Sequence, residues 1–320
     1  MNKHLDTTLP HFTSIDVFCG GGGASCGIHK AGFSSVLCID VNTNALECLK
    51  ANYTNVPILQ KPVQYITAKE VFKITGLKQG QLDHLHGSPP CQSYSTANSK
   101  AAANPPENAN VYFYEFIRLI DELKPKTFTA ENVDGMMKGA KRPYFNNIIK
   151  KLHSLTDYEF KYKTVNCALY GVPQDRKRVI FIGKRKDIAP NEPICFPNPN
   201  AEATRFLTVK MVAPHIEWYD PCQFKAPMKD NTNLMCTIIA TDRMQVKVAG
   251  KWRGMTIAEM KMFMGFPDSY VMPSKSRHVN VRILGNAVPP PMMYSVMLCV
   301  RKLLSEHGKG NEANTIYNLQ

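Results

Sequence analysis

Residues 14–23 read Ser-Ile-Asp-Val-Phe-Cys-Gly-Gly-Gly-Gly, and this stretch decides the fold. Its first five residues form a short apolar strand pattern, and the four glycines follow almost at once. An apolar-periodic stretch at 24–31 then predicts a helix, and a second strand at 35–39 runs into Asp40. A strand, a glycine loop, a helix, a strand and an acid in this order are typical of a nucleotide-binding βαβ unit.

The glycine loop would let backbone N–H groups approach a ligand closely at a helix N-terminus. It is not a Walker P-loop, because no Gly-Lys-Ser/Thr follows, and Ser25 stands where the third glycine of Gly-x-Gly-x-x-Gly would fall. The loop fits an aromatic-x-Gly-x-Gly-Gly pattern that begins at Phe18. Asp40 can then accept both ribose hydroxyls of an adenosine. A tight turn with a surface aspartate is the alternative interpretation.

The charge and the cysteines limit the class of protein. The chain has 320 residues and a formal net charge of +13, which indicates a polyanionic partner, nucleic acid before a membrane surface. No apolar run approaches the ~20 residues of a membrane span. The ten cysteines never fall as Cys-x-x-Cys, so the sequence predicts neither a zinc site nor a disulfide framework. Reduced thiols in a cytoplasm or nucleoplasm are the simplest interpretation.

Strands and helices continue to alternate after Asp40. The pattern predicts helices at 44–53, 112–123 and 144–155, and strands within 57–65 and at 81–87, 127–130, 158–165 and 178–183. We therefore expect an α/β fold with a doubly wound, mostly parallel sheet.

The composition changes after Lys186, and this change predicts a second, smaller domain. We expect a catalytic and cofactor-binding domain at 1–186 plus 263–307, a small irregular β-containing domain at 187–262, and a disordered tail at 308–320. Within the second half, the pattern predicts strands at 234–241 and 244–248, helices at 256–264 and 292–304, and a turn at 285–291.

Pro89-Pro90-Cys91-Gln92 follows the strand predicted at 81–87. Two prolines cannot continue a strand, because they lack the N–H donor and fix φ. Cys91 is therefore presented on a rigid turn at the carboxyl edge of the sheet, where open α/β sheets bind ligands. A cysteine in this place is a candidate nucleophile, and a buried structural cysteine is the alternative.

Glu131-Asn132 closes another strand of the same sheet, so we expect it near Cys91. A carboxyl group beside a thiol disfavours the thiolate, since like charges raise each other's pKa. The pair makes chemical sense if the acid acts on the substrate while the thiol attacks it. A helix cap or a surface pair is the alternative.

Two further clusters carry polar side chains on one strand face. Strand alternation puts Gln174, Arg176 and Arg178 together, and arginines at a sheet edge suit a phosphate or a base carbonyl. A solvated basic strand start is the alternative there. His84 and His86 also share a face, but no third ligand stands at a usual spacing, so we expect no metal.

Together these motifs resemble those of the cytosine-5 DNA methyltransferase family, in order through the whole chain. The matching segments are Asp16 to Gly23, Asp40, Pro89-Pro90-Cys91-Gln92, Glu131-Asn132-Val133, Gln174-x-Arg176-x-Arg178, Gly265-Phe266-Pro267 and Gly285-Asn286-Ala287-Val288-Pro289-Pro290. The resemblance implies the Rossmann-like fold of class I S-adenosylmethionine-dependent methyltransferases, with 187–262 as the target-recognition domain.

The resemblance also implies the reaction. The methyl group of S-adenosylmethionine would pass to carbon 5 of a cytosine flipped out of duplex DNA at a specific short sequence. Cys91 would add to carbon 6, and Glu131 would act protonated at N3, with a raised pKa. Arg176 or Arg178 would hold O2 and nearby phosphates, and the loop at 93–110 would close over the base.

The residues that the resemblance assigns fall into three sets. The expected catalytic residues are Cys91, Glu131, Asn132, Gln174, Arg176 and Arg178. The expected cofactor-binding residues are Phe18, Cys19, Gly20, Gly21, Gly22, Gly23, Asp40, Val41, Gln64, Ser88, Pro90, Asn286, Ala287 and Val288. The expected substrate contacts are Pro90, Gln92, Ser95, Arg176, Arg178, Arg243, Lys247, Lys251 and Arg253.

The sequence departs from the family in two places. The family usually carries an adenine-binding aspartate after the third strand, but this chain has Lys61-Pro62-Val63-Gln64 there. Gln64 or a backbone carbonyl is the expected substitute. His84 and His86 occupy a strand that is usually more apolar.

Two alternative functions remain open. A tRNA-acting branch of the family carries a Cys-Phe-Thr motif, and Cys236-Thr237 lacks its phenylalanine, which favours DNA. A catalytically silent nucleic-acid-binding homologue is the other alternative, and the presence of Cys91 and Glu131 argues against it. We expect a monomer with no stable protein partner and no membrane. The sequence leaves open whether a restriction endonuclease of the same specificity accompanies it. Its compartment would be the cytoplasm, at the nucleoid, in a bacterium or phage, and the nucleus in a eukaryote.

Overall fold

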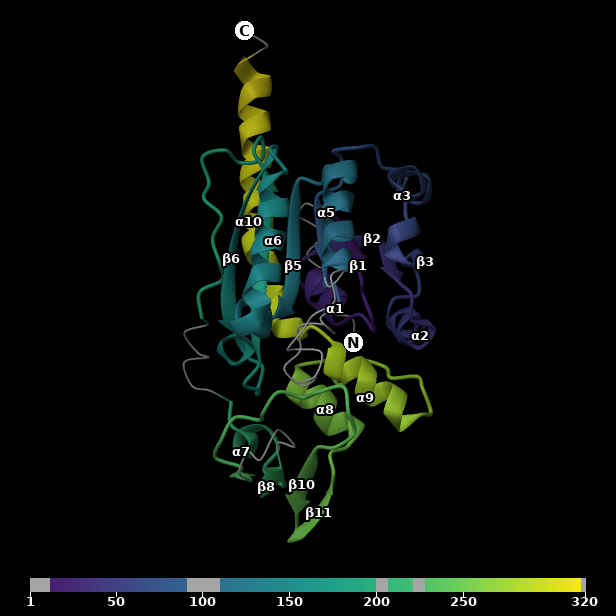
Figure 1. The fold of residues 1–320 in the computed structure, drawn as a ribbon, viewed down its shortest axis with the longest axis vertical. Coiled ribbons are helices and arrows are strands. Elements are labelled where there is room, and N and C mark those ends of the chain that lie inside the picture. Colours follow the sequence, from purple (N-terminus) through teal and green to yellow (C-terminus); the bar gives the residue numbers. More distant parts are fainter. Residues whose placement is uncertain (1–11, 91–109, 200–206, 221–227, 318–320) are drawn as a thin grey trace.

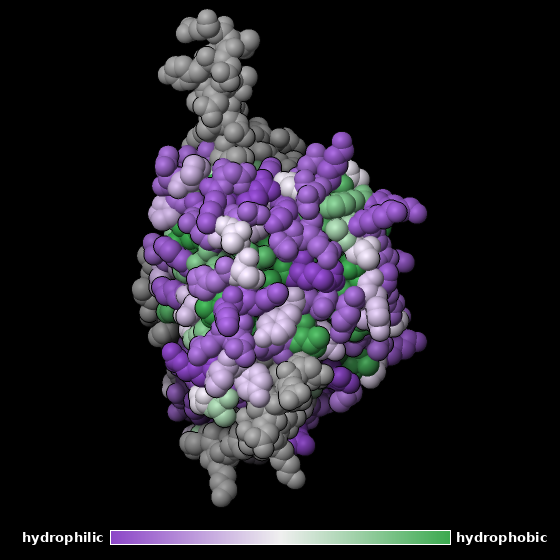
Figure 2. Space-filling view, turned by 45° about the horizontal axis from the view of Figure 1, so that its top comes forward, coloured by the Kyte–Doolittle hydropathy of each residue, from purple (hydrophilic) through white to green (hydrophobic). Residues whose placement is uncertain are grey.

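The computed structural model describes residues 12–90, 110–199, 207–220 and 228–317, of which 307–317 are described as backbone only. Figure 1 shows a large sheet flanked by helices and, at the other end of the molecule, a smaller sheet. On the face shown in Figure 2, hydrophilic residues predominate and apolar residues are scattered among them in small groups.

A seven-stranded sheet forms the large part, in the order β3-β2-β1-β4-β5-β7-β6. The strands are β1 (Phe12–Val17), β2 (Phe33–Asp40), β3 (Ile58–Gln60), β4 (His84–Gly87), β5 (Thr127–Val133), β6 (Tyr158–Asn166) and β7 (Lys177–Arg185). The first five are parallel, and β7 runs antiparallel to both β5 and β6. The predicted doubly wound, mostly parallel α/β fold is confirmed.

Helices cover both faces of this sheet, because parallel strands are apolar on both sides. The longer helices are α1 (Gly23–Lys30), α2 (Thr43–Asn52), α3 (Ala68–Thr75), α5 (Val111–Leu123), α6 (Arg142–His153), α8 (Ile257–Met264), α9 (Arg277–Asn286) and α10 (Pro290–Tyr317). One apolar core joins α5 and α6 to the sheet, with Phe116 and Ile148 fully buried. A second core on the other face joins α1 and α10, through Ile28 and Val296 among others. Figure 1 shows α5 and α6 in front of the sheet and α10 behind it.

The smaller sheet has the order β11-β10-β8-β9 and is antiparallel. Its strands are β8 (Trp218–Asp220), β9 (Lys229–Asp230), β10 (Gln245–Val248) and β11 (Lys251–Gly254). Tyr219 and Val246 share a core with Phe263 of α8 and Leu284 of α9. The sheet falls within the range predicted for the small domain, 187–262, while the domain division itself stays a prediction.

Short helical turns complete the fold. They are α7 (Val209–Val212) and the 3-10 turns η1 (Val63–Tyr65), η2 (Asp134–Met137), η3 (Gly139–Lys141) and η4 (Cys167–Tyr170).

Several expected elements were wrong. The segment 234–241 is not a strand, because only Met235 pairs, in an isolated bridge with Gln174, and the apolar side chains that suggested a strand pack into the small core. The strand expected at 81–87 begins only at His84, and β5 runs on through Glu131 and Asn132.

The end of the chain also differs from expectation. The turn expected at 285–291 begins as the last two residues of α9, a helix that the sequence analysis missed. The backbone of α10 continues to Tyr317, where we expected a disordered tail after 307.

The range Arg277–Glu306 is long and apolar enough to cross a membrane by length and composition, which corrects our expectation that no apolar run approaches this length. Its most apolar window is 61% buried in the fold. Burial of Val281, Met292 and Val300 in the apolar cores accounts for its composition.

Candidate active site

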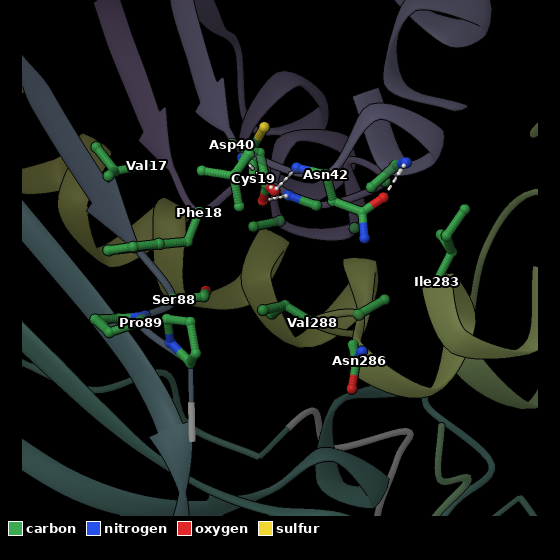
Figure 3. Close-up of a pocket in the computed structure, with 18 of the residues that line it drawn as sticks. Val17, Phe18, Cys19, Asp40, Asn42, Ser88, Pro89, Ile283, Asn286 and Val288 are labelled. Atoms are coloured by element: carbon green, nitrogen blue, oxygen red, sulfur yellow. Dashed lines mark hydrogen bonds between the residues drawn. The ribbon is translucent and has the colours of Figure 1, made fainter. Parts of the chain in front are cut away.

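A cavity of about 700 Å³ opens at the carboxyl ends of β1, β2, β4 and β5, and α9 and the start of α10 close it (Figure 3). The expected site residues that line it are Phe18, Cys19, Gly20, Gly21, Gly23, Asp40, Val41, Gln64, Ser88, Pro90, Glu131, Asn132, Arg176, Arg178, Asn286, Ala287 and Val288. Gly22 and Gln174 do not line it. Segments far apart in the sequence therefore meet at the edge where ligands bind in such sheets.

The glycine loop is packed so closely at Gly21, Gly22 and Gly23 that side chains would not fit there. Gly22 has φ of +84°, a left-handed conformation that favours glycine, and it precedes α1 without a side-chain cap. A Cβ at Gly23 would collide with the carbonyl oxygen of Val288, two residues before α10 begins. Ser25, in the place of a third glycine, donates a 2.5 Å hydrogen bond to Asp16 Oδ2 on β1. Gly23 and Ala24 line the cavity, so the N-terminus of α1, where the first backbone N–H groups have no partner within the helix, lies at its wall.

Asp40 holds the loop as well as facing the cavity. Its Oδ2 accepts from the Gly20 N–H at 2.8 Å, and its Oδ1 accepts from the N–H groups of Val41 and Asn42 at 2.7 and 2.8 Å (Figure 3). A carboxylate has about four acceptor positions. These bonds leave about one position for a ligand hydroxyl, whereas we expected the carboxylate to accept two.

The segment Lys61-Pro62-Val63-Gln64 forms the cavity wall beyond Asp40. Lys61 N–H donates to the Asp40 carbonyl oxygen at 3.2 Å, and its ammonium pairs with Glu70 of α3 at 2.8 Å. The lysine charge is therefore balanced by a neighbouring helix. Gln64 is exposed and lines the cavity, and its role toward adenine stays a prediction.

At the β5 end of the cavity, Glu131 and Arg178 form a buried ion pair. Arg178 Nε lies 2.8 Å from Glu131 Oε1, and both residues are 8% exposed. Burial raises the pKa of Glu131, and the neighbouring guanidiniums of Arg178 and Arg176 lower it in part, so that the net shift is upward. Asn132 Nδ2 donates to the Pro89 carbonyl oxygen at 3.2 Å, which ties β5 to the double-proline turn. The arrangement favours a carboxyl group that can hold a proton.

Gln174 and Arg176 brace the walls of the site. Gln174 donates to the Phe263 carbonyl oxygen at 3.0 Å and accepts from the Ile238 N–H at 2.9 Å. Arg176, 2% exposed, donates to the carbonyl oxygens of Ile238, Gly285 and Ala287 at 2.8, 3.1 and 3.0 Å. We had placed Gln174 among the catalytic residues, but its side chain joins the segment at 238 to α8. Arg176 lines the cavity, and its contact with substrate stays a prediction.

Cys91, Gln92 and Ser95 lie outside the described residues, as does the predicted closing loop apart from Asn110. Pro90 is the last residue before this gap, and it lines the cavity. The predicted nucleophile thus directly follows a residue of the cavity wall, and its role stays a prediction.

The basic residues expected to contact DNA lie outside the cavity wall, on and around β10 and β11. Arg243 and Lys251 are exposed, and Lys247 is half-buried between Trp218 and Trp252 in the register of the small sheet. The Arg253 guanidinium pairs with Glu259 at 2.7 Å. Burial opposes ionisation of Glu259, but its bonds to Arg253, Thr256 and His215 prevail and lower its pKa to about 2. Because of this ion pair, we interpret Arg253 as a residue that stabilises the small sheet.

Sequence reasoning missed the cavity-facing side of α9. The cavity wall includes His278, Val279, Arg282 and Ile283 from this helix. The i, i+4 spacing of the polar pair and of the apolar pair is the signal that could have found this face. The helix was missed because charged residues interrupt its short apolar pattern.

His84 and His86 are buried in the sheet and bonded to hydroxyl groups. Among the described residues, no group of three His, Cys, Asp or Glu side chains could hold a metal ion.

Comparison with known proteins finds a protein family that matches this chain. A family model described as C-5 cytosine-specific DNA methylase matches residues 12–217 and 201–300. The type II methyltransferase M.FnuDI of Fusobacterium nucleatum is 27% identical, over 92% of this chain and 96% of its own. The type II methyltransferase M.MthTI of Methanothermobacter thermautotrophicus is also 27% identical, over 89% and 96%. An E. coli protein provisionally described as a DNA modification methyltransferase encoded within a prophage shares the fold, with a TM-score of 0.67 at 19% identity over 92% of this chain and 99% of that one.

Proposed function

Because the chain belongs to the C-5 cytosine-specific DNA methylase family, we propose how this DNA cytosine-5 methyltransferase works. It transfers the methyl group of S-adenosylmethionine to carbon 5 of a cytosine flipped out of duplex DNA at a specific short sequence. The transfer runs through a covalent adduct between Cys91 and carbon 6. The observation that carries this mechanism is the buried Glu131–Arg178 pair in the cavity that Pro90 also lines.

The glycine-loop end of the cavity fits S-adenosylmethionine, which supplies an activated methyl group when it is bound. The cavity volume of about 700 Å³ suits a nucleoside-sized ligand. Gly20 and Gly23 leave the backbone open to close approach, and Asp40 keeps an acceptor position for a ribose hydroxyl. Asn286 and Val288 close the cavity opposite this loop (Figure 3).

Carbon 5 of cytosine is too weak a nucleophile to take a methyl group unaided. Addition of the Cys91 thiolate to carbon 6 forms an S–C bond and moves electron density to N3 and O2, which makes carbon 5 enamine-like. Carbon 5 could then take the methyl group, with the electron pair of the S–CH3 bond staying on sulfur and S-adenosylhomocysteine leaving. Loss of its proton to solvent returns an electron pair to the ring, and cleavage of the S–C bond releases Cys91 as the thiolate.

Glu131 stabilises the charge that addition creates. Its raised pKa lets it present a proton to N3, because burial disfavours the carboxylate. Arg178 holds the carboxyl group in place and offers its remaining donors to O2. The two residues thus act on N3 and O2, two polar atoms on the same edge of one base.

The net charge of +13 supports binding to the phosphates of DNA. We assign the loop at 93–110 to closure over the flipped base, and Arg243, Lys247 and Lys251 to contacts at the target sequence. The type II relatives support a restriction endonuclease of the same specificity as the biological partner. We further propose a monomer that acts where the DNA is, at the nucleoid of a bacterial or phage-infected cell or in a nucleus.

Duplex DNA that contains 5-fluorocytosine tests the mechanism, because fluorine at carbon 5 cannot leave as a proton does and the adduct is trapped. In the presence of S-adenosylmethionine, the wild-type protein should form a complex with this DNA that survives denaturing electrophoresis. Cys91→Ser should form none. Absence of the wild-type complex would overturn the mechanism, and its persistence in the variant would overturn the assignment of Cys91.

A further inference from the structure

A chain of hydrogen-bonded side chains runs through the middle of the large sheet to the cavity. His84 Nδ1 lies 3.0 Å from Thr127 Oγ1, and His84 Nε2 lies 2.9 Å from Thr129 Oγ1. The Thr129 hydroxyl also lies 2.8 Å from His86 Nδ1, and His86 Nε2 lies 3.0 Å from Ser88 Oγ. Thr127, His84, Thr129 and His86 are at most 1% exposed, and Ser88 lines the cavity. This series of hydrogen bonds therefore links the interior of the sheet to the ligand site.

The backbone sets the direction of the first bonds. Thr127 Oγ1 lies 2.7 Å from the carbonyl oxygen of Asp83, which can only accept, so the single hydroxyl proton of Thr127 is used there. Thr127 must then accept from His84 Nδ1–H. A neutral imidazole with its proton on Nδ1 has a bare Nε2. His84 Nε2 therefore accepts from the hydroxyl of Thr129.

The same reasoning sets the direction of the remaining hydrogen bonds, as far as the cavity. Thr129 has given its only proton to His84, so its oxygen accepts from His86 Nδ1–H. The Nε2 of a neutral His86 is then bare and accepts from the hydroxyl of Ser88. The proton of Ser88 points into the protein, and the serine oxygen offers lone pairs to the cavity.

This order requires both imidazoles to be neutral. Burial lowers the pKa of His84 well below its usual value, with a smaller contribution from His86, and burial lowers the pKa of His86 to about 3. Asp16 is the register partner of His86 on β1, but its Oδ2 accepts from Ser25 and not from an imidazole. Both ring nitrogens of each histidine already have hydroxyl partners.

We infer that Ser88 acts toward the cavity as a hydrogen-bond acceptor, held in this state by Thr127, His84, Thr129 and His86, and that it receives the α-ammonium of S-adenosylmethionine. The assignment of the ligand rests on the proposed function. S-adenosylmethionine carries hydrogen-bond donors on its adenine amino group, on its two ribose hydroxyls and on the ammonium of its amino-acid end. Asp40, the ribose-binding candidate, lies on β2, two strands and about 10 Å from β4, and the expected adenine segment lies beyond it.

The position of Ser88 favours the amino-acid end. Figure 3 shows Ser88 between Phe18 and Val288, on the side of the cavity away from Asn42. The adenine amino group would therefore lie far from Ser88, and the ammonium is the donor within reach. An acceptor-only serine also repels the carboxylate of the same end, so it fixes which of the two groups binds here.

Nitrogen NMR of the wild-type protein labelled with ¹⁵N-histidine tests, without any ligand, the direction of the hydrogen bonds between Thr127 and Ser88. We expect His84 and His86 to be neutral at pH 7, each with a protonated Nδ1 and an unprotonated Nε2. Thr129→Val removes the central hydroxyl, and His86 should then lose its preference for the Nδ1 proton. A protonated Nε2 on either histidine in the wild type would overturn the inference, whatever the enzyme methylates.

Calorimetric binding of S-adenosylhomocysteine, which keeps the ammonium, tests the ligand assignment in the absence of DNA. Ser88→Ala should weaken binding by about 10-fold or more, since a hydrogen bond to a charged group is lost. The 2-oxo analogue, in which a carbonyl replaces the ammonium, should bind Ser88→Ala and wild type equally. Ser35→Ala is the matched control, because Ser35 Oγ bonds His29 Nε2 at 2.7 Å away from the cavity, and it should leave binding unchanged.

Equal loss of both ligands in Ser88→Ala, or no loss of either, would overturn the ammonium assignment. If neither ligand loses affinity, the amino group of the cytosine would be the remaining donor to Ser88. Failure of the wild-type protein to bind S-adenosylhomocysteine would contradict the proposed function instead, and the NMR result would still stand on its own.

Discussion

The two ends of the cavity are built by different means. At the glycine-loop end, backbone N–H groups and close packing form the wall, and Asp40 is itself held by three N–H groups. At the β5 end, the buried carboxyl group of Glu131 and the buried guanidinium of Arg178 face each other at 2.8 Å. Backbone groups do not titrate, whereas a buried carboxyl group does. Ligand binding at the glycine-loop end therefore depends on shape, whereas the chemistry at the β5 end depends on a proton.

The largest effect should come from Glu131→Gln at the β5 end. Glutamine keeps the shape but cannot supply a proton, so kcat should fall by about 10²- to 10⁴-fold. In the wild type, the rate should fall as pH rises through the raised pKa of Glu131, because only the protonated acid acts. The variant should lack this limb and should bind S-adenosylhomocysteine normally. Methylation kinetics between pH 5 and 9 measure both, and an unchanged rate would remove Glu131 from the mechanism.

At the glycine-loop end, Gly23→Ala should weaken binding of S-adenosylhomocysteine by about 10- to 100-fold. Its Cβ would meet the Val288 carbonyl oxygen, and strain of this kind costs about 1–3 kcal/mol. Gly254→Ala is the control, since its Cβ meets only an ordinary contact at 3.5 Å. Calorimetry at several pH values should show the same loss at each. Equal affinities of the two variants would contradict the packing argument.

Arg178→Met sharpens the comparison by changing the charge beside Glu131. Loss of the guanidinium removes an influence that lowers the pKa of Glu131, so this pKa should rise further. The descending limb of the pH–rate profile should move upward by about one pH unit. Arg118→Met removes two ion pairs on α5 and the bonds to the carbonyl oxygens of Val63 and Ile66, but it leaves the charge beside Glu131 unchanged, so the limb should stay in place. A shift to lower pH in Arg178→Met would reverse the assigned electrostatics.

Gln174→Leu should affect stability and not the chemistry. It leaves the Ile238 N–H and the Phe263 carbonyl oxygen without their partner inside the protein, at a cost of about 1–3 kcal/mol. We expect the midpoint of thermal unfolding to fall by about 3–6 °C. The pH–rate profile should keep its shape. A variant as stable as the wild type but inactive would return Gln174 to the catalytic residues.

The smallest effect should come from Gln64→Ala, which tests the residue standing near the place of the missing acid. An exposed hydrogen bond contributes about 0.5–1.5 kcal/mol, so affinity for S-adenosylhomocysteine should fall by about 2- to 10-fold. Lys61→Met, which breaks only the pair with Glu70, should change affinity by less. If Gln64→Ala binds as tightly as the wild type, a backbone carbonyl is the adenine contact.

Local motifs made much of this site predictable, because the residues that face the cavity sit at the carboxyl ends of strands. The glycine loop, Asp40 and Glu131 follow from strand order alone. The brace formed by Gln174 and Arg176 did not, since its partners are backbone groups more than 60 residues away. The cavity face of α9 and the direction of the histidine chain likewise depend on tertiary contacts, which no local pattern contains.

The central claim is that this chain methylates carbon 5 of cytosine in DNA through Cys91. Bisulfite sequencing of a plasmid from cells that express the protein tests it most directly, because it reports activity and target together. We expect protected cytosines at one short sequence with the wild type and none with Cys91→Ser at equal expression. Protection that persists in Cys91→Ser, or a wild-type plasmid with no protected cytosine, would contradict the claim.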